Sequence, residues 1–222
     1  MIAIIPARAG SKRIPRKNAK EFKGQPLFLW AAQAAADSGV FDKIVISSDD
    51  PEILLKGNYQ GFYTEYRLPE FCTDHVQLDQ VMQIMAAQHA DDLCLVYCNP
   101  FTRAANLRDG FKMFVDRDCV HVTAMSPRRT ASSALEWVDA GQFSYGKNWA
   151  WAHGGLEYGP ECSRIAIPSE TNVDINTPED WALAEDLWDR IVSKDRQRLV
   201  APIKDWHWPG TRQIASNADS RG

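Results

Sequence analysis

The segment most suggestive of chemistry is the basic stretch 6–18, which reads PARAGSKRIPRKN. It carries five cations within ten residues, namely Arg8, Lys12, Arg13, Arg16 and Lys17. The small residues Ala9, Gly10 and Ser11 lie among them and let backbone N–H groups approach an anion closely. Cations and small residues together favour a polyphosphate-binding loop, although neither the Walker nor the Rossmann glycine pattern is present. A solvated basic loop is the alternative interpretation.

A second pattern, VDINT at 173–177, places Asp174 and Asn176 two residues apart. In an extended segment this spacing turns both side chains to the same side. Carboxylate and amide oxygens suit Mg²⁺, which usually takes one or two carboxylates and completes its shell with phosphates and water. Alternatively, Asp174 ties down a turn and Asn176 begins a helix cap.

A third polar group, SSDD at 47–50, ends another apolar run. These side chains either bind a base or ribose, or cap a short helix that begins at Pro51. The five histidines share no spacing typical of a metal site or a catalytic triad, and no GxSxG motif is present.

The elements that must position these groups follow from hydrophobic patterning. Apolar runs at 2–5, 43–47, 93–97 and 119–123 are typical of strands buried on both faces. Helical patterns are predicted between and after them, at 26–38, 77–89, 104–115 and 178–192. This alternation predicts an α/β fold with a mostly parallel sheet flanked by helices. All three polar segments then follow strands, at the sheet edge where open α/β folds bind ligands.

The rest of the chain is organised less clearly. Residues 126–170 are rich in Trp, Gly, Ser and Pro, with one strand-like piece at 142–145, and are interpreted as an insertion or lid on the sheet edge. Thr177 is expected to cap the last helix, with Asp180 as its capping-box partner. We therefore expect one domain over 1–192 and a C-terminal extension over 193–222.

Composition narrows the functional classes. With 45% hydrophobic and 24% charged residues, the 222-residue chain is neither disordered, collagenous nor coiled-coil. A net charge of −4 argues against nucleic acid as the main partner, although the extension is basic. Five cysteines without a CxxC pair favour reduced thiols, and no apolar run approaches the ~20 residues that span a membrane. We expect a cytoplasmic protein without membrane or nucleic-acid partners.

The sequence IIPARAGSKRIPRKN resembles the N-terminal signature of cytidylyltransferases that make CMP-activated nine-carbon acidic sugars, the acylneuraminate, pseudaminate and legionaminate enzymes. Further segments agree in order: IVISSDDPEI, RLPEFCTD at 67–74, DAGQFSYGK at 139–147 and VDINTPEDWALAE at 173–185. The resemblance covers roughly residues 1–190, and its DAGQF and TPEDW segments are most similar to the pseudaminate branch.

This resemblance implies a Rossmann-like nucleotide-diphospho-sugar transferase fold with a small lid or dimerisation insertion. It also implies a Mg²⁺-dependent reaction in which the anomeric hydroxyl of an acidic nine- or eight-carbon sugar attacks the α-phosphate of CTP and pyrophosphate leaves. A homodimer is expected. By position, Arg8 and Lys17 would be catalytic, and the sugar would contact Asn99, Gln142 and Tyr145. Asp174 and Asn176 would hold the metal. The nucleotide-binding set would be Ala7, Arg8, Ala9, Gly10, Ser11, Arg13, Lys17, Asn18 and Arg67.

Three departures from the family pattern leave an alternative open. Asn176 stands where the family has a second aspartate, so metal affinity should fall. Residues 97–101 read YCNPF instead of a TAPF- or TSPL-type segment, and the stretch between Met125 and Asp139 is short. The alternative is a catalytically weak or silent relative that binds nucleotide or sugar nucleotide.

Overall fold

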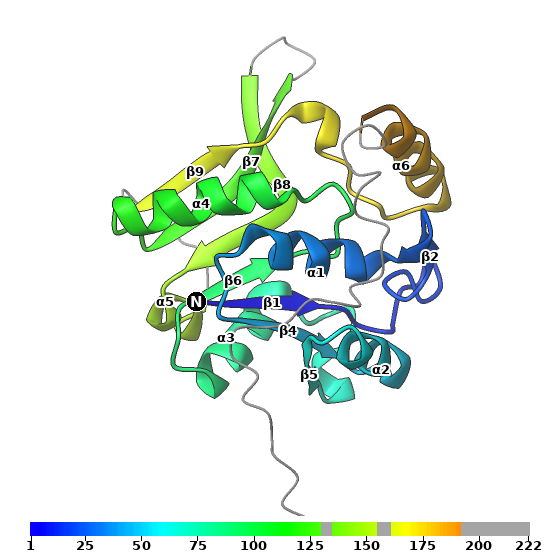
Figure 1. Ribbon diagram of the computed structural model, residues 1–222, viewed down its shortest axis with the longest axis horizontal. Helices are drawn as coiled ribbons and strands as arrows, with labels where there is room; N and C mark the ends of the chain where they lie inside the picture. The colour runs from blue at the N-terminus through cyan, green and yellow to red at the C-terminus, as the bar shows by residue number, and fades with distance from the viewer. Residues whose placement is uncertain (130–134, 155–160, 192–222) are drawn as a thin grey trace, which may run out of the picture.

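A seven-stranded sheet forms the centre of the computed structural model, which describes residues 1–129, 135–154 and 161–191 (Figure 1). In spatial order the strands are β5 (Tyr63–Tyr66), β4 (Lys43–Ser48), β1 (Ile2–Pro6), β6 (Leu93–Val96), β8 (Leu135–Gly146), β7 (His121–Arg129) and β9 (Cys162–Ala166). Neighbouring strands from β5 to β6 run parallel, as do β7 and β9, whereas β8 is antiparallel to both of its neighbours. The expected mostly parallel α/β sheet is confirmed.

Helices cover both faces of this sheet. They are α1 (Leu27–Ser38), α2 (Pro51–Tyr59), α3 (Leu78–Gln88), α4 (Ala104–Asp116), α5 (Asn148–Ala152) and α6 (Pro178–Ile191). Alternate residues of β1 face opposite layers, since side chains alternate across a strand. Ala3 and Ile5 belong to the core cluster that contains residues of α1 and α4, whereas Ile2 and Ile4 pack with residues of α3 and with Trp151 of α5.

Several predicted helix ends are confirmed by their caps. Gly39 ends α1 with φ 68°, a left-handed conformation that glycine adopts without a steric penalty. Asp50 caps α2 by accepting from the N–H of Glu52 at 2.9 Å, so capping is the correct interpretation for this carboxylate. Thr177 and Asp180 form the expected reciprocal cap at the start of α6, with bonds of 2.8 and 3.2 Å.

The interpretation of 126–170 as a lid on the sheet edge is wrong for β8. This strand lies inside the sheet, hydrogen-bonded to β6 on one side and β7 on the other. The strand-like piece at 142–145 is part of β8, but its polar residues Gln142 and Ser144, both buried, are not typical of a central strand. Ser144 satisfies its hydroxyl by donating to Thr123 Oγ1 at 3.2 Å. Of this stretch, β9 does lie at the sheet edge, and residues 130–134 and 155–160 lie outside the described part.

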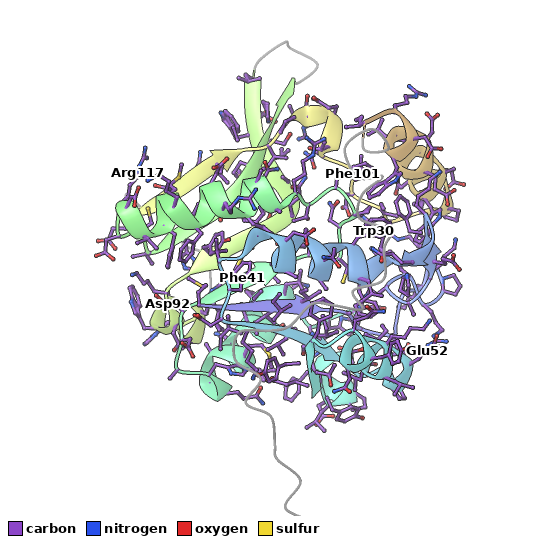
Figure 2. The ribbon with its side chains drawn as sticks, viewed as in Figure 1. Trp30, Phe41, Glu52, Asp92, Phe101 and Arg117 are labelled. Carbon is purple, nitrogen blue, oxygen red and sulfur yellow. The ribbon has the colours of Figure 1, made fainter. Side chains whose placement is uncertain are left out.

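A third hydrophobic cluster joins α6 to the beginning of the chain. The hairpin of β2 (Glu21–Phe22) and β3 (Gln25–Pro26) leads into α1, and Phe22 packs edge-on against Trp188 of α6 at 5.5 Å. Trp30 and Phe101 lie beside α6 (Figure 2), and both rings contact Trp188. Ile14 and Ile175 belong to the same cluster, which therefore fixes the basic segment and the 173–177 segment relative to each other.

Within the described residues, no helix combines the length and apolarity needed to cross a membrane. The predicted C-terminal extension 193–222 and the expected last helical residue, Val192, lie outside the part of the chain that the structure describes.

Candidate active site

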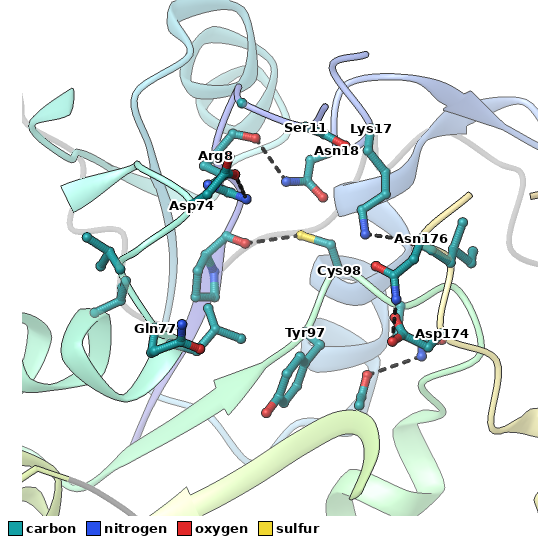
Figure 3. Close-up of a pocket in the computed structure, with 18 of the residues that line it drawn as sticks. Arg8, Ser11, Lys17, Asn18, Asp74, Gln77, Tyr97, Cys98, Asp174 and Asn176 are labelled. Carbon is teal, nitrogen blue, oxygen red and sulfur yellow. Dashed lines mark hydrogen bonds and ion pairs between the residues drawn. The ribbon is translucent and has the colours of Figure 1, made fainter. Parts of the chain in front are cut away.

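A pocket of about 880 Å³ opens at the carboxyl ends of β1 and β6 (Figure 3). Its walls come from segments that are far apart in the sequence, within 6–18, 67–81, 97–99, 139–141 and 172–176. The parallel strands deliver their following loops to one edge, which is where open α/β sheets bind ligands. The topology thus brings the basic segment and the Asp174 segment together, as the sequence predicted.

One wall is basic and belongs to the loop after β1. It contributes four cations, Arg8, Lys12, Arg13 and Lys17. Gly10 and Ser11 lie on the same wall. Arg16, the fifth cation of the motif, does not line the pocket, because its backbone has φ 52° and its guanidinium pairs with Asp50 at 2.6 Å and Glu52 at 2.8 Å. Four of the five cations therefore line the pocket, and their contact with phosphate stays a prediction.

Ala7 and Ala9 belong to the predicted nucleotide-binding set, but their backbone N–H groups are engaged within the protein. The N–H of Ala7 donates to the carbonyl of Ser47 at 2.9 Å, because the hydrogen bonding between β1 and β4 continues past Pro6. The N–H of Ala9 donates to Asp49 Oδ1 at 2.7 Å. These hydrogen bonds give the loop its shape, and Asp49 holds the loop through the Ala9 N–H.

Asn18 is buried where the basic loop returns toward the sheet. Its side-chain amide nitrogen donates to the backbone carbonyl of Arg8 at 3.0 Å. The backbone carbonyl of Asn18 accepts from the N–H of Phe28 at 3.1 Å. Asn18 therefore ties the two ends of the loop together while still lining the pocket. Its contact with the nucleotide stays a prediction.

Lys17 connects the basic loop to the opposite wall. Its ammonium donates to the backbone carbonyl of Ile175 at 2.7 Å. Ile175 is the residue between Asp174 and Asn176. Burial lowers the pKa of Lys17 from its ordinary value, and the nearby charges of Arg8 and Arg13 lower it further, while Asp174 opposes the shift. A partly desolvated cation held beside an oxygen-rich wall acts strongly on an anion, because water screens it little.

Asp174 and Asn176 converge, as their spacing predicted. The amide nitrogen of Asn176 donates to Asp174 Oδ2, and both residues line the pocket. Asp180 Oδ2 holds the backbone by accepting from the N–H groups of Asn176 at 3.0 Å and Thr177 at 2.8 Å. The helix cap and the ligand-bearing segment are thus one structure, so the two interpretations of this motif are compatible.

The donor set fits a magnesium ion that shares its ligands with phosphate. Asp174 offers a carboxylate and Asn176 an amide oxygen once the amide turns over, and Mg²⁺ typically binds one or two such groups with phosphates and water. In the described part of the chain, no three His, Cys, Asp or Glu side chains cluster as a metal cage of their own. A cation here would therefore depend on ligand oxygens as well as protein oxygens.

Two further carboxylates line the pocket, and sequence reasoning missed them as site residues. Asp74 pairs with Arg8 at 2.7 Å and with Lys12 at 2.6 Å. Asp139 accepts from the N–H of Gly141 at 2.7 Å and from the Tyr97 hydroxyl at 3.3 Å. Burial raises the pKa of Asp139 above its ordinary value. Both lie in segments quoted for the family resemblance, which was the only available signal, since neither has a diagnostic spacing.

Asn99 reaches the pocket wall, but its side-chain groups are engaged with backbone. Its amide nitrogen donates to the carbonyls of Gly141 at 3.1 Å and Val173 at 3.3 Å, and its oxygen accepts from the N–H of Phe101 at 2.9 Å. It therefore joins the segment after β6, the bend in β8 and the Asp174 segment. Sugar contact by Asn99 stays a prediction.

Gln142 and Tyr145, which were predicted to contact the sugar, do not line the pocket. Tyr145 is fully buried, and its hydroxyl donates to the carbonyl of Leu107 in α4 at 2.8 Å. Gln142 is also fully buried and donates to the carbonyl of Thr171 at 3.2 Å. These side chains are buried in the core because β8 lies inside the sheet, between β6 and β7.

Arg67 and Cys98 complete the buried part of the pocket. Arg67 lines it, and its Nε donates to Cys72 Sγ at 3.0 Å. Its contact with the nucleotide stays a prediction. Burial raises the pKa of Cys98 to about 12, so this thiol is protonated at neutral pH and is a poor nucleophile. The arrangement instead suits binding and charge neutralisation of a polyphosphate, which is what phosphoryl transfer chiefly demands.

Comparison with known proteins gives agreeing results. The profile of a family described as Cytidylyltransferase matches residues 2–65. Pseudaminic acid cytidylyltransferase of Campylobacter jejuni subsp. jejuni serotype O:23/36 (strain 81-176) is 28% identical over 221 residues, covering 84% of this chain and 95% of that protein. N-acylneuraminate cytidylyltransferase A of Danio rerio is 28% identical over 231 residues, covering 89% of this chain and 53% of the relative.

Solved structures share the fold. A CMP:2-keto-3-deoxy-manno-octonic acid synthetase complexed with CTP superposes with a TM-score of 0.69 at 15% identity, covering 85% of this chain and 98% of that chain. The 4-diphosphocytidyl-2C-methyl-D-erythritol synthase from Anaerococcus prevotii DSM 20548 gives 0.60 at 13% identity, with the same coverage. At these identities the likeness establishes the α/β architecture alone.

Proposed function

We propose that the chain is a cytidylyltransferase that transfers CMP from CTP to the anomeric hydroxyl of an acidic nine- or eight-carbon sugar, with release of pyrophosphate. The observation that carries this proposal is the pocket in which four cations of the loop after β1 lie opposite the Asp174 and Asn176 pair. This pairing of a polyphosphate cradle with oxygen ligands for a cation suits a nucleoside triphosphate.

In the proposed reaction the triphosphate lies along Gly10 and Ser11, with Arg8 and Lys17 on its oxygens. The anomeric oxygen forms a bond to the α-phosphorus, its proton passes to solvent, and the bond to the bridging oxygen of the β-phosphate breaks. Negative charge grows on the departing pyrophosphate. Lys17 is held in place by the carbonyl of Ile175, so it can stabilise this charge with little rearrangement.

A magnesium ion held by Asp174 and Asn176 would neutralise phosphate charge and orient the α-phosphate. Lys17 connects the two walls, which supports this position for the phosphate.

The acceptor is placed on the other side of the pocket. Gln77, Tyr97 and Asp139 line this wall and offer donors and acceptors to a polyhydroxylated sugar. The acidic character of the sugar is proposed from the relatives, which are named for pseudaminic acid and N-acylneuraminate. The homodimer and the cytoplasmic location stay predictions.

The test is pyrophosphate release by the purified protein with Mg²⁺, comparing CTP with the other nucleoside triphosphates against a panel of eight- and nine-carbon ulosonic acids. Release with CTP and one acid supports the proposal and identifies the acceptor. If every acid is inactive while a neutral sugar supports release, the proposed acceptor class is wrong.

One observation favours the alternative of a weak or silent relative that binds nucleotide or sugar nucleotide. Asn176 brings no charge, and its amide donates to Asp174, so a cation must disrupt this hydrogen bond before binding. Asn176→Asp distinguishes the two cases. If metal-dependent turnover arises only in this variant, the natural protein is a binder. If the natural protein already turns over well, the alternative is excluded.

A further inference from the structure

Asp74 forms ion pairs with two of the four cations of the basic loop that line the pocket, Arg8 and Lys12. We propose that Asp74 is a built-in competing anion, which holds Arg8 and Lys12 in the nucleotide-free protein, weakens the grip on phosphate and speeds the departure of pyrophosphate. This inference rests on the proposed function, because it takes the basic loop to be the phosphate cradle.

The geometry matches that of a phosphate surrogate. One carboxylate oxygen of Asp74 lies 2.7 Å from Arg8 Nη2, and the other lies 2.6 Å from Lys12 Nζ. All three residues line the pocket, and Figure 3 shows Arg8 and Asp74 turned toward each other beside it. Each carboxylate oxygen pairs with a different cation, as two oxygens of a bound phosphate group would.

The contacts favour competition over a positioning role. Arg8 has a second anchor, since its Nη1 donates to the carbonyl of Cys72 at 3.1 Å. Its backbone is fixed by Asn18, whose side-chain amide donates to the Arg8 carbonyl at 3.0 Å. The guanidinium therefore keeps its place without the charge of Asp74. The Lys12 side chain is 84% exposed, so its ammonium is free to swing between Asp74 and a ligand.

The charge of Asp74 should weaken the binding of phosphate groups to the basic loop. A phosphate bound at Gly10 and Ser11 must share Arg8 and Lys12 with Asp74 or displace it, and it also feels the repulsion of the carboxylate. Pyrophosphate carries the most charge per atom of the reactants and products. Its affinity should therefore rise most when the charge of the Asp74 carboxylate is removed. The Asp74 side chain is about one-third exposed. Its electrostatic effect on a bound phosphate should therefore be larger than that of an exposed surface charge and smaller than that of a buried one.

The discriminating variant is Asp74→Asn, which keeps an oxygen for the Arg8 hydrogen bond and removes the charge. We expect the dissociation constant for pyrophosphate, measured by calorimetry, to fall about tenfold, and the KM for CTP to fall with it. A positioning role predicts the opposite, because loss of the ion pair would loosen Arg8. The matched control is Asp116→Asn, which removes the same charge from an exposed pair with Lys112 on α4 and should leave binding unchanged.

The outcomes separate this inference from the proposed function. Unchanged or weaker pyrophosphate binding in a folded Asp74→Asn protein overturns the inference, whatever the turnover of CTP. Tighter binding in the variant, together with no CTP turnover by the natural protein, supports the competing anion and refutes the proposed reaction. If neither protein binds pyrophosphate, the cradle and the inference are both wrong. Thermal unfolding of both variants shows whether they are folded.

Discussion

Replacing Lys17 with methionine removes one charge from the centre of the proposed site while keeping a side chain of similar length. The ammonium lies 2.7 Å from the carbonyl of Ile175 and links the basic loop to the Asp174 segment. Because the side chain is partly desolvated, water screens its charge less than that of an exposed lysine. Loss of one preorganised donor of this kind lowers kcat by roughly 10²- to 10³-fold, equivalent to about 2.7–4 kcal/mol.

The same change should have little effect on folding. Methionine loses the hydrogen bond to the Ile175 carbonyl, which is worth about 1 kcal/mol, but it also relieves the cost of burying a charge. We therefore expect the free energy of unfolding to change by no more than about 1 kcal/mol. The cost of burying this charge is already visible in the lowered pKa of Lys17.

The assay is pyrophosphate release at saturating CTP and acceptor, with urea unfolding in parallel. Lys20→Met is the matched control, because Lys20 lies over the Trp181 ring at 4.1 Å, outside the pocket lining. This control should keep its activity and lose about 0.5–1 kcal/mol of cation–π stabilisation. If folded Lys17→Met turns over within tenfold of the natural protein, the assignment of Lys17 is refuted.

Three further changes test other parts of the account. Asn176→Asp should tighten Mg²⁺ binding in the presence of CTP by about tenfold, because it adds a charged oxygen ligand; equal affinity in a metal titration would show that Asn176 is not a ligand. Tyr145→Phe should lower stability by about 0.5–1.5 kcal/mol through loss of the bond to Leu107, with an unchanged acceptor KM; a large rise in that KM would return Tyr145 to the sugar site. Asp180→Ala should lower the free energy of unfolding by about 1 kcal/mol, because it removes the cap of α6. It should also weaken metal binding, since Asp180 holds the backbone of Asn176. An unchanged metal affinity would show that Asp180 does not support the metal site.

Much of the framework was predictable because local patterns agreed with the tertiary structure. The apolar runs that became β1, β4 and β6 are buried on both faces, which is the environment that such runs indicate. The loops that follow these strands had to meet at one sheet edge, which placed the basic loop there. The Asp174 segment was expected at a strand end, but it follows β9 and the 3-10 turn Ser169–Thr171 and reaches the same pocket from there.

The remainder depends on contacts between distant residues. Arg8 and Asp74 are separated by 66 positions in the chain, and no periodicity links them. Arg16 lies in the same basic segment as the cations that line the pocket, but its backbone is left-handed and its guanidinium pairs with Asp50. Tyr145 was assigned to the sugar by position in a motif, and only the placement of β8 between β6 and β7 shows that it belongs to the core.

The most direct test of the central claim is a crystal structure of the protein with CTP and Mg²⁺. We predict that the triphosphate lies against Gly10 and Ser11, that the Lys17 ammonium contacts a phosphate oxygen, and that the metal is bound by Asp174. A triphosphate bound elsewhere, or a CTP molecule that places its base in the basic loop, would contradict the account.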